Sequence, residues 1–241
     1  MRKKGTTMIL QLRNSRQTWN DLLLGDRGLP RRWIEEHSFA AVPFCLVTIF
    51  LGVGLYGASV GLWQGGRQAV YLSIKLPWVI LLTLGTNALL NGILARLLGI
   101  QVGLRQTTIA LLFAFAVFAL IVGALSPVTI GMALGAPPPD SELAGKTHRH
   151  LIIVHTGIIV FAGIISTGRL HSLLIGFSKT KSAARQGLIA LLAGNLFAGA
   201  QIGFLFRPIF GQPGLKIEFL RPDLFEGNFY ESVWWALRHA F

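Results

Sequence analysis

Three histidines that lie close together are the first residues whose type and spacing could support chemistry. His148, His150 and His155 follow Asp140 and Glu142, and imidazole and carboxylate groups are common metal ligands. A metal site needs three or four ligands that converge on one point. His148 and His155 can share a helical face, but His150 does not join them there. We therefore predict no metal and no cofactor, and these histidines remain only secondary candidates.

The remaining residues form no recognisable catalytic motif. Ser59, Ser126 and Ser166 have no histidine and carboxylate at a spacing that indicates a catalytic triad. The His-Glu-x-x-His pattern and phosphate-binding loops are absent from the sequence. We expect no catalytic residue. A membrane enzyme that acts on lipid through His155 and the acids of the C-terminal tail is the third and last alternative.

Four carboxamide side chains interrupt otherwise apolar stretches: Asn87, Asn91, Asn195 and Gln201. An amide in hydrocarbon is costly unless it finds a hydrogen-bond partner. The economical arrangement packs the second apolar stretch against the fifth, so that the amides bond to each other or to freed backbone groups. The amides then serve either as structural bonds or as the polar lining of a pathway. No Asp or Glu lies within any apolar stretch, which argues against a proton-coupled carrier.

Charged residues near one end of these stretches form a second candidate group: Lys75, Arg207, Glu218 and Asp223. Lys75 lies about one turn inside the second stretch. Its ammonium group either reaches back to the lipid headgroups or pairs with a tail carboxylate such as Glu218, Asp223 or Glu226. Such a pair would hold the tail over the mouth of the bundle.

Five apolar runs must position all of these residues, and they cover positions 39–62, 71–95, 107–125, 151–168 and 187–206. A helix needs roughly 20 apolar residues to cross a hydrocarbon core. The runs are continuous rather than alternating, which excludes a transmembrane β-barrel. We predict an all-α, polytopic transmembrane helix bundle of about five spans. Ser126 and Pro127 leave open whether the apolar residues 127–134 extend the third span.

The chain divides into three parts: an arm at 1–37, a transmembrane bundle at 38–206 and a tail at 207–241. Apolar residues in the arm favour one helical face, which is typical of an amphipathic helix in the headgroup layer. The tail ends in a second segment of this kind. Two GxxxG patterns, Gly57 with Gly61 and Gly199 with Gly203, predict close helix packing, within the chain or in a dimer.

The net charge of +12 is distributed unequally between the two sides of this layout. The arm and the even-numbered loops carry fourteen basic and four acidic side chains, whereas the other side carries eight and six. The positive-inside rule then places the N-terminus in the cytoplasm and the C-terminus outside, in a bacterial inner membrane. Anionic lipids at the cytoplasmic face account for the basic excess, so we expect no nucleic-acid partner.

Several sequence runs resemble a family of uncharacterised bacterial polytopic membrane proteins. These runs occupy positions 75–83, 87–91, 207–213 and 219–231, and the resemblance would cover roughly residues 38–238. It implies a multi-pass fold and transfers no activity. The layout of a cytoplasmic arm followed by five spans is also loosely similar to Yip1-type membrane proteins, in architecture alone.

Two functions of different classes fit these observations. The favoured hypothesis is a non-catalytic scaffold or accessory subunit of a membrane complex, whose partners are the lipid bilayer and other subunits or a second copy of itself. The alternative is a small transporter or channel with a polar pathway between the second and fifth spans. In that case Lys75 and Arg207 would select anions at the outer mouth.

Overall fold

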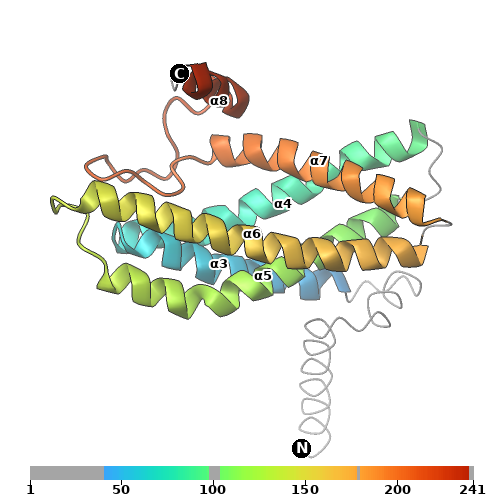
Figure 1. Ribbon diagram of the computed structural model, residues 1–241, viewed down its shortest axis with the longest axis horizontal. Helices are drawn as coiled ribbons and strands as arrows, with labels where there is room; N and C mark the ends of the chain where they lie inside the picture. The colour runs from blue at the N-terminus through green and yellow to red at the C-terminus, as the bar shows by residue number, and fades with distance from the viewer. Residues whose placement is uncertain (1–40, 98–103, 178–179, 239–241) are drawn as a thin grey trace, which may run out of the picture.

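The computed structural model describes residues 41–97, 104–177 and 180–238, and these residues form a bundle of long helices (Figure 1). The described elements are α3 (Ala41–Leu62), α4 (Gly66–Leu97), α5 (Leu104–Gly135), α6 (Ala144–Phe177), α7 (Lys181–Leu205) and the short α8 (Phe229–Arg238), with no strand among them. The predicted all-α fold class is therefore confirmed. The amphipathic arm predicted at 1–37 lies outside the described residues.

Five of these helices are long and apolar enough to cross a membrane. The candidate spans are Val42–Leu62, Gly66–Leu90, Thr107–Gly135, Ala144–Ile175 and Ala184–Leu205, with mean hydropathies between 1.5 and 2.7. This is the architecture of a multi-pass membrane protein. The spans extend beyond several of the predicted runs because helices continue past the last apolar residue into the polar flanks.

The third span continues through Pro127 and ends only at Gly135. Proline cannot donate a backbone hydrogen bond to the preceding turn, so one bond of the helix is missing there. The helix persists because its neighbours pack along this turn: Ser126 and Thr129 are both buried, and the Ser126 hydroxyl donates to the Val122 carbonyl at 3.1 Å. Residues 127–134 therefore belong to the third span.

The centre of the bundle is formed by α3 and α5, where 56% of each span is buried. Small residues allow the two backbones to approach closely. A Cβ atom placed on Gly52 would lie 2.3 Å from the carbonyl oxygen of Ala119, and one on Gly123 would lie 2.9 Å from the Cα of Gly52. Any side chain at Gly52 would force the helices apart, so this contact depends on glycine.

The GxxxG pattern of α3 packs against α4 rather than against α7. A Cβ atom on Gly57 would lie 2.3 Å from the Leu72 carbonyl oxygen, and one on Gly61 would lie 2.5 Å from that of Gln68. The prediction of close packing within the chain thus applies to consecutive helices, because the short turn after α3 folds α4 straight back onto it. On α7, Gly199 faces Thr83 of α4 and Gly203 faces Ile209 of the tail, both at ordinary contact distances.

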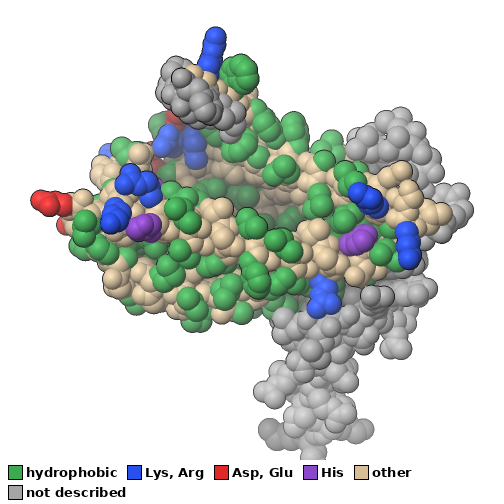
Figure 2. Space-filling view, in the orientation of Figure 1, with side chains coloured by type: hydrophobic (Ala, Val, Ile, Leu, Met, Phe, Trp, Pro, Cys, Tyr) green, Lys and Arg blue, Asp and Glu red, His purple; other side chains and the backbone are tan. Residues whose placement is uncertain are grey.

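The helices α6 and α7 are the least buried spans, at 22% and 11%. Large apolar side chains cover their outer surfaces, including Ile164, which is 67% exposed, and Leu196, which is 76% exposed. Hydrophobic side chains spread over the middle of the molecule in Figure 2, whereas charged side chains gather toward its ends. Such a surface is suited to lipid rather than water.

The tail leaves α7, crosses one end of the bundle and returns to place α8 over α7 (Figure 1). Asn228 caps α8, since its side-chain oxygen accepts a hydrogen bond from the Glu231 N–H at 2.9 Å. The ring of Tyr230 stacks on Phe197 of α7 with centroids 5.2 Å apart, and its hydroxyl donates to the Phe197 carbonyl at 2.9 Å. The tail is therefore docked on the bundle.

Candidate functional site

A cavity of about 550 Å³ lies within the spanning part of the bundle, between α6 and α7. We call it the lateral cavity. All five spanning helices contribute to its wall, and Ile209 and Phe210 of the tail close one end. The surface in Figure 2 is hollowed between the same two helices. The volume falls in the range of small-molecule sites, roughly 300–1,000 Å³.

The wall of the lateral cavity is mainly apolar, with a few polar groups placed on it. Apolar side chains such as Leu76, Phe115 and Phe118 supply most of the lining. The polar groups among the lining residues come from four different helices: Tyr56, Thr83, Ser166, Thr167 and Asn195. An apolar wall with few polar groups is typical of a site for an apolar molecule that is oriented by a small number of hydrogen bonds.

Thr83 stands out among these polar groups. Its side chain is 4% exposed, and its hydroxyl oxygen has no hydrogen-bond partner within the described part of the chain. Thr83 faces Gly199, where an added Cβ atom would lie 3.6 Å from the Thr83 hydroxyl oxygen. The hydroxyl oxygen has almost no accessible surface, so it lies covered in the contact between α4 and α7.

One turn further along α4, Asn87 joins α4 to α7. Its amide Nδ2 donates to the Leu191 carbonyl at 2.9 Å and also to the side-chain oxygen of Asn195. Asn87 is fully buried, so these bonds satisfy a polar group in the apolar interior. The structure thus brings together two residues of the predicted amide seam.

The other two members of the predicted seam do not join this contact. Gln201 lies about 9 Å further along α7, given a rise of about 1.5 Å per residue, and its side-chain oxygen accepts a hydrogen bond from the Phe229 N–H at 3.1 Å. It therefore bonds to a backbone group, which was one of the two expected kinds of partner, and that group belongs to the start of α8 rather than to α4. Asn91 lies in α4, but its side chain is outside the described part of the structure.

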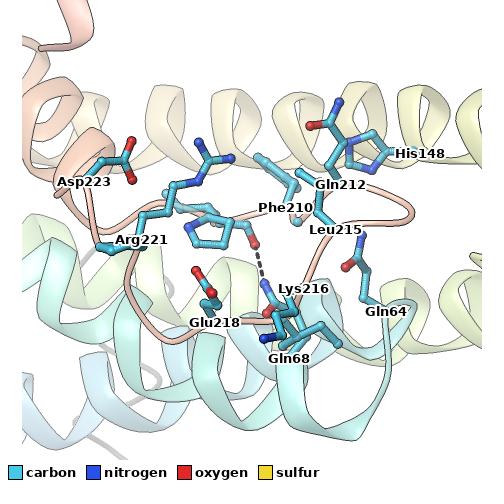
Figure 3. Close-up of a pocket in the computed structure, with 15 residues that line it drawn as sticks. Gln64, Gln68, His148, Phe210, Gln212, Leu215, Lys216, Glu218, Arg221 and Asp223 are labelled. Atoms are coloured by element: carbon cyan, nitrogen blue, oxygen red, sulfur yellow. Dashed lines mark hydrogen bonds between the residues drawn. The ribbon is translucent and has the colours of Figure 1, made fainter. Parts of the chain in front are cut away.

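The tail encloses a second, polar cavity of about 520 Å³ at the end of the bundle, which we call the tail pocket (Figure 3). Gln64 and Gln68 line it from the α3–α4 turn and the start of α4, and His148 lines it from α6. Lys216, Glu218, Arg221 and Asp223 line it from the tail. Ile209 and Phe210 line both cavities and so form a common wall between them.

Lys75 is fully buried beneath this wall. Its ammonium group donates to the Pro208 carbonyl at 3.3 Å and lies 5.2 Å from the centre of the Phe219 ring. Within the described residues it makes no ion pair with Glu218, Asp223 or Glu226, which corrects one of the two arrangements predicted for it. Lys75 also does not reach the surface, because the tail covers it.

The tail carboxylate Asp223 pairs instead with Arg207, at 3.2 Å. The same guanidinium group donates to the carbonyl oxygens of Phe204, Asp223 and Glu226. A hydrogen bond from the backbone of Asp223 itself, followed by the hydrogen bond and charge of Arg207, lowers the pKa of the Asp223 carboxyl. Arg207 therefore holds the tail in place through these bonds, and its charge is paired rather than free at the end of the bundle.

The three histidines occupy separate environments. His148 stacks on Trp63 with ring centroids 5.9 Å apart, and His150 is exposed. His155 is buried and accepts or donates a hydrogen bond at Nδ1, 2.9 Å from the Tyr56 hydroxyl. No group of three or more potential metal ligands converges within the described residues.

Sequence reasoning identified Asn195 on the wall of the lateral cavity but not Thr83 or Tyr56. Threonine and tyrosine are ordinary residues of membrane helices, so nothing in their type or spacing distinguishes them. The cavity itself depends on how far α6 and α7 stand from the α3–α5 core, a distance that no local sequence pattern encodes.

The comparisons with known proteins add nothing to this geometry. No family profile, no curated protein and no solved structure matches the chain. Any function proposed for the protein therefore depends on its own residues and cavities.

Proposed function

We propose that this multi-pass protein binds a small apolar molecule drawn from the bilayer, without transforming it. The lateral cavity is the observation that carries this proposal. It has the volume of a small-molecule site, lies within the spanning helices and is lined mainly by apolar side chains. A molecule already dissolved in lipid could enter between α6 and α7 without crossing water. Of the two functions expected from the sequence, this favours the transporter class, with an apolar rather than an ionic cargo.

A variant that fills the cavity tests the proposal. Gly163 lines the lateral cavity, and an added Cβ atom there would meet nothing within 4 Å. Gly163→Leu should therefore fold normally and occupy part of the cavity. Gly157→Leu is the matched control, because Gly157 lies on the same helix, is exposed and has equally open space around it.

The measurement is native mass spectrometry of the protein released from nanodiscs of a bacterial polar lipid extract. We expect wild type and Gly157→Leu to retain the same bound small molecules, and Gly163→Leu to lose at least 90% of them. Equal retention by all three proteins would refute binding in the lateral cavity.

A scaffold or accessory subunit is the second candidate, and the tail favours it. Phe225 is 84% exposed and Trp234 is 67% exposed, although both lie beyond the last spanning helix. Exposed aromatic side chains of this kind anchor interfaces with other proteins or with lipid headgroups. Purification in mild detergent tests this candidate: a stoichiometric membrane partner lost in Trp234→Ser supports it, and recovery of a lone monomer under several conditions opposes it.

We further infer that the basic end of the bundle faces the cytoplasm and contacts anionic lipids, and that the membrane is the bacterial inner membrane. The charge asymmetry of the loops supports this orientation.

A further inference from the structure

The tail pocket lies on the other side of Ile209 and Phe210 from the lateral cavity, and basic side chains outnumber acidic ones around it. We propose that it binds the phosphate group of a phosphomonoester, which belongs either to a lipid headgroup or to a water-soluble compound. The two cavities are separate, so this site does not depend on the function proposed for the lateral cavity.

Two basic side chains of the tail, Lys216 and Arg221, line the pocket directly (Figure 3). Neither of them forms an ion pair within the described residues, where the pair of the tail is Arg207 with Asp223. Arg221 is half-buried, whereas Lys216 is exposed. A guanidinium group carries five N–H donors in a planar fork that matches the oxygen atoms of a phosphate. Arg221 is therefore the main candidate for contact with an anion.

Two further basic groups bond to residues of the pocket wall. The Lys75 ammonium group donates to the carbonyl oxygen of Pro208, and Arg207 pairs with Asp223. Lys75 is fully buried and has no acidic partner among the described residues. A buried charge without a counter-charge is costly. An anion in the tail pocket, across the Pro208 wall, would offset this charge.

Acidic side chains compensate only part of this positive charge. Glu218 and Asp223 are the acidic residues that line the pocket, and Asp223 is already paired with Arg207. With histidine taken as neutral, four basic and two acidic side chains line the pocket or bond to its wall, which leaves an excess of two positive charges. A phosphomonoester carries about −1.5 to −2 charges at pH 7 and so matches this excess. A carboxylate or a phosphodiester carries a single charge.

The pocket is also larger than a phosphate group alone. Its volume is about 520 Å³, within the range of small-molecule sites, and Phe210, Leu215 and Ile217 add apolar side chains to its lining. These side chains can contact the organic part of an ester. We therefore favour an organic phosphate over the inorganic ion.

The test is isothermal titration calorimetry of the full-length protein in phosphatidylcholine nanodiscs, with phenyl phosphate as the ligand and empty nanodiscs as the blank. Benzenesulfonate has a similar shape and a single charge, so it should bind wild type about tenfold more weakly. Arg221→Gln should weaken binding of phenyl phosphate about tenfold. Arg149→Gln is the matched control, because it removes the same charge from an exposed position of α6 that does not line the pocket. It should bind like wild type.

Glu218→Gln provides a gain of binding that misfolding cannot imitate. It removes the acidic side chain that is left without an ion pair in the pocket, so phenyl phosphate should bind about threefold more tightly. Unchanged or weaker binding in Glu218→Gln would overturn the proposal, as would equal affinities of wild type for phenyl phosphate and benzenesulfonate. No binding of phenyl phosphate to wild type would also overturn it. Gly163→Leu should bind phenyl phosphate like wild type, so this site and the lateral cavity can fail independently.

Lipid competitors distinguish the two sources of the phosphate group. Phosphatidic acid and phosphatidylglycerol are added to the nanodiscs at equal surface charge. Displacement of phenyl phosphate by phosphatidic acid alone identifies a lipid headgroup, and displacement by neither lipid identifies a water-soluble compound. Equal displacement by both lipids would show that a single negative charge is sufficient, and would overturn the assignment of a phosphomonoester.

Discussion

At the scale of single residues, the pairing of Asn87 with Asn195 could be predicted from the sequence. An amide side chain inside an apolar run needs a hydrogen-bond partner, and the apolar runs contain few other polar side chains. The placement of Gln201, Lys75 and Arg207 could not be predicted, because each of these residues bonds to backbone groups of the tail. Backbone donors and acceptors occur along the whole chain, so sequence alone does not indicate which one a side chain will meet.

The Asn87 contact yields the first prediction at this scale. Asn87→Leu removes the bonds to Leu191 and Asn195, and we expect it to lower the free energy of unfolding by about 1–2 kcal/mol. Steric-trapping measurements of unfolding in bicelles would give this value. Ser172→Ala serves as the control, because the Ser172 hydroxyl bonds only within its own helix at an exposed position. Equal stability of the two variants would contradict a structural role for the amide pair.

Asp223 yields a prediction on pH dependence. Its pKa is lowered in the folded protein, by its own backbone hydrogen bond and then by Arg207, so the carboxylate stabilises tail docking at neutral pH. This contribution is present above the ordinary pKa of 3.8 and is lost as the pH falls through the lowered value. Amide hydrogen exchange in residues 207–229, corrected for intrinsic rate, should accelerate below that point. Asp223→Asn should exchange faster at neutral pH and lack this transition.

At the scale of the helices, five spans could be predicted because a long apolar run has few alternatives to a membrane helix. The residues at which these spans begin and end were harder to predict. Pro127 is a helix breaker by local rules, yet α5 continues past it because packing along the buried face outweighs one missing hydrogen bond. Likewise, the helix that packs against Gly57 and Gly61 could not be identified, since a helix face formed by glycine allows the close approach of any other helix and does not select one.

The contact between α3 and α5 provides the prediction at this scale. Gly52→Val places a branched side chain where the Ala119 carbonyl already lies, and overpacking of this kind costs typically 1–3 kcal/mol. We expect a clear loss of monodisperse protein on size exclusion in detergent. Gly157→Val, in open space on α6, should elute like wild type. A well-behaved Gly52→Val protein would show that α3 and α5 do not require this close approach.

At the scale of the whole molecule, five membrane crossings by the candidate spans of the described residues would set the start of α3 and the end of α7 on opposite sides of the membrane. The positive-inside rule associates the side that is richer in Lys and Arg with the cytoplasm. We predict that Glu142, between α5 and α6, faces outward and that Ser182, at the start of α7, faces the cytoplasm.

Cysteine accessibility in intact cells tests this orientation. In a Cys45→Ala background, Glu142→Cys should react with a membrane-impermeant maleimide, and Ser182→Cys should react only after the cells are permeabilised. The opposite pattern would show that the orientation in the membrane is the reverse of the predicted one. Labelling of both positions from outside would contradict an odd number of spans. Cys45 itself is buried, so its replacement removes a background thiol without exposing a surface.

The spans also differ in length, and this has a consequence for the bilayer. At about 1.5 Å per residue, the 29 residues of the third span extend about 43 Å, whereas the 22 residues of the fifth extend about 33 Å. A hydrocarbon layer of roughly 30 Å accommodates the shorter helix nearly upright and requires the longer one to tilt. We therefore expect the thickness of the bilayer to change how far these two helices tilt relative to each other.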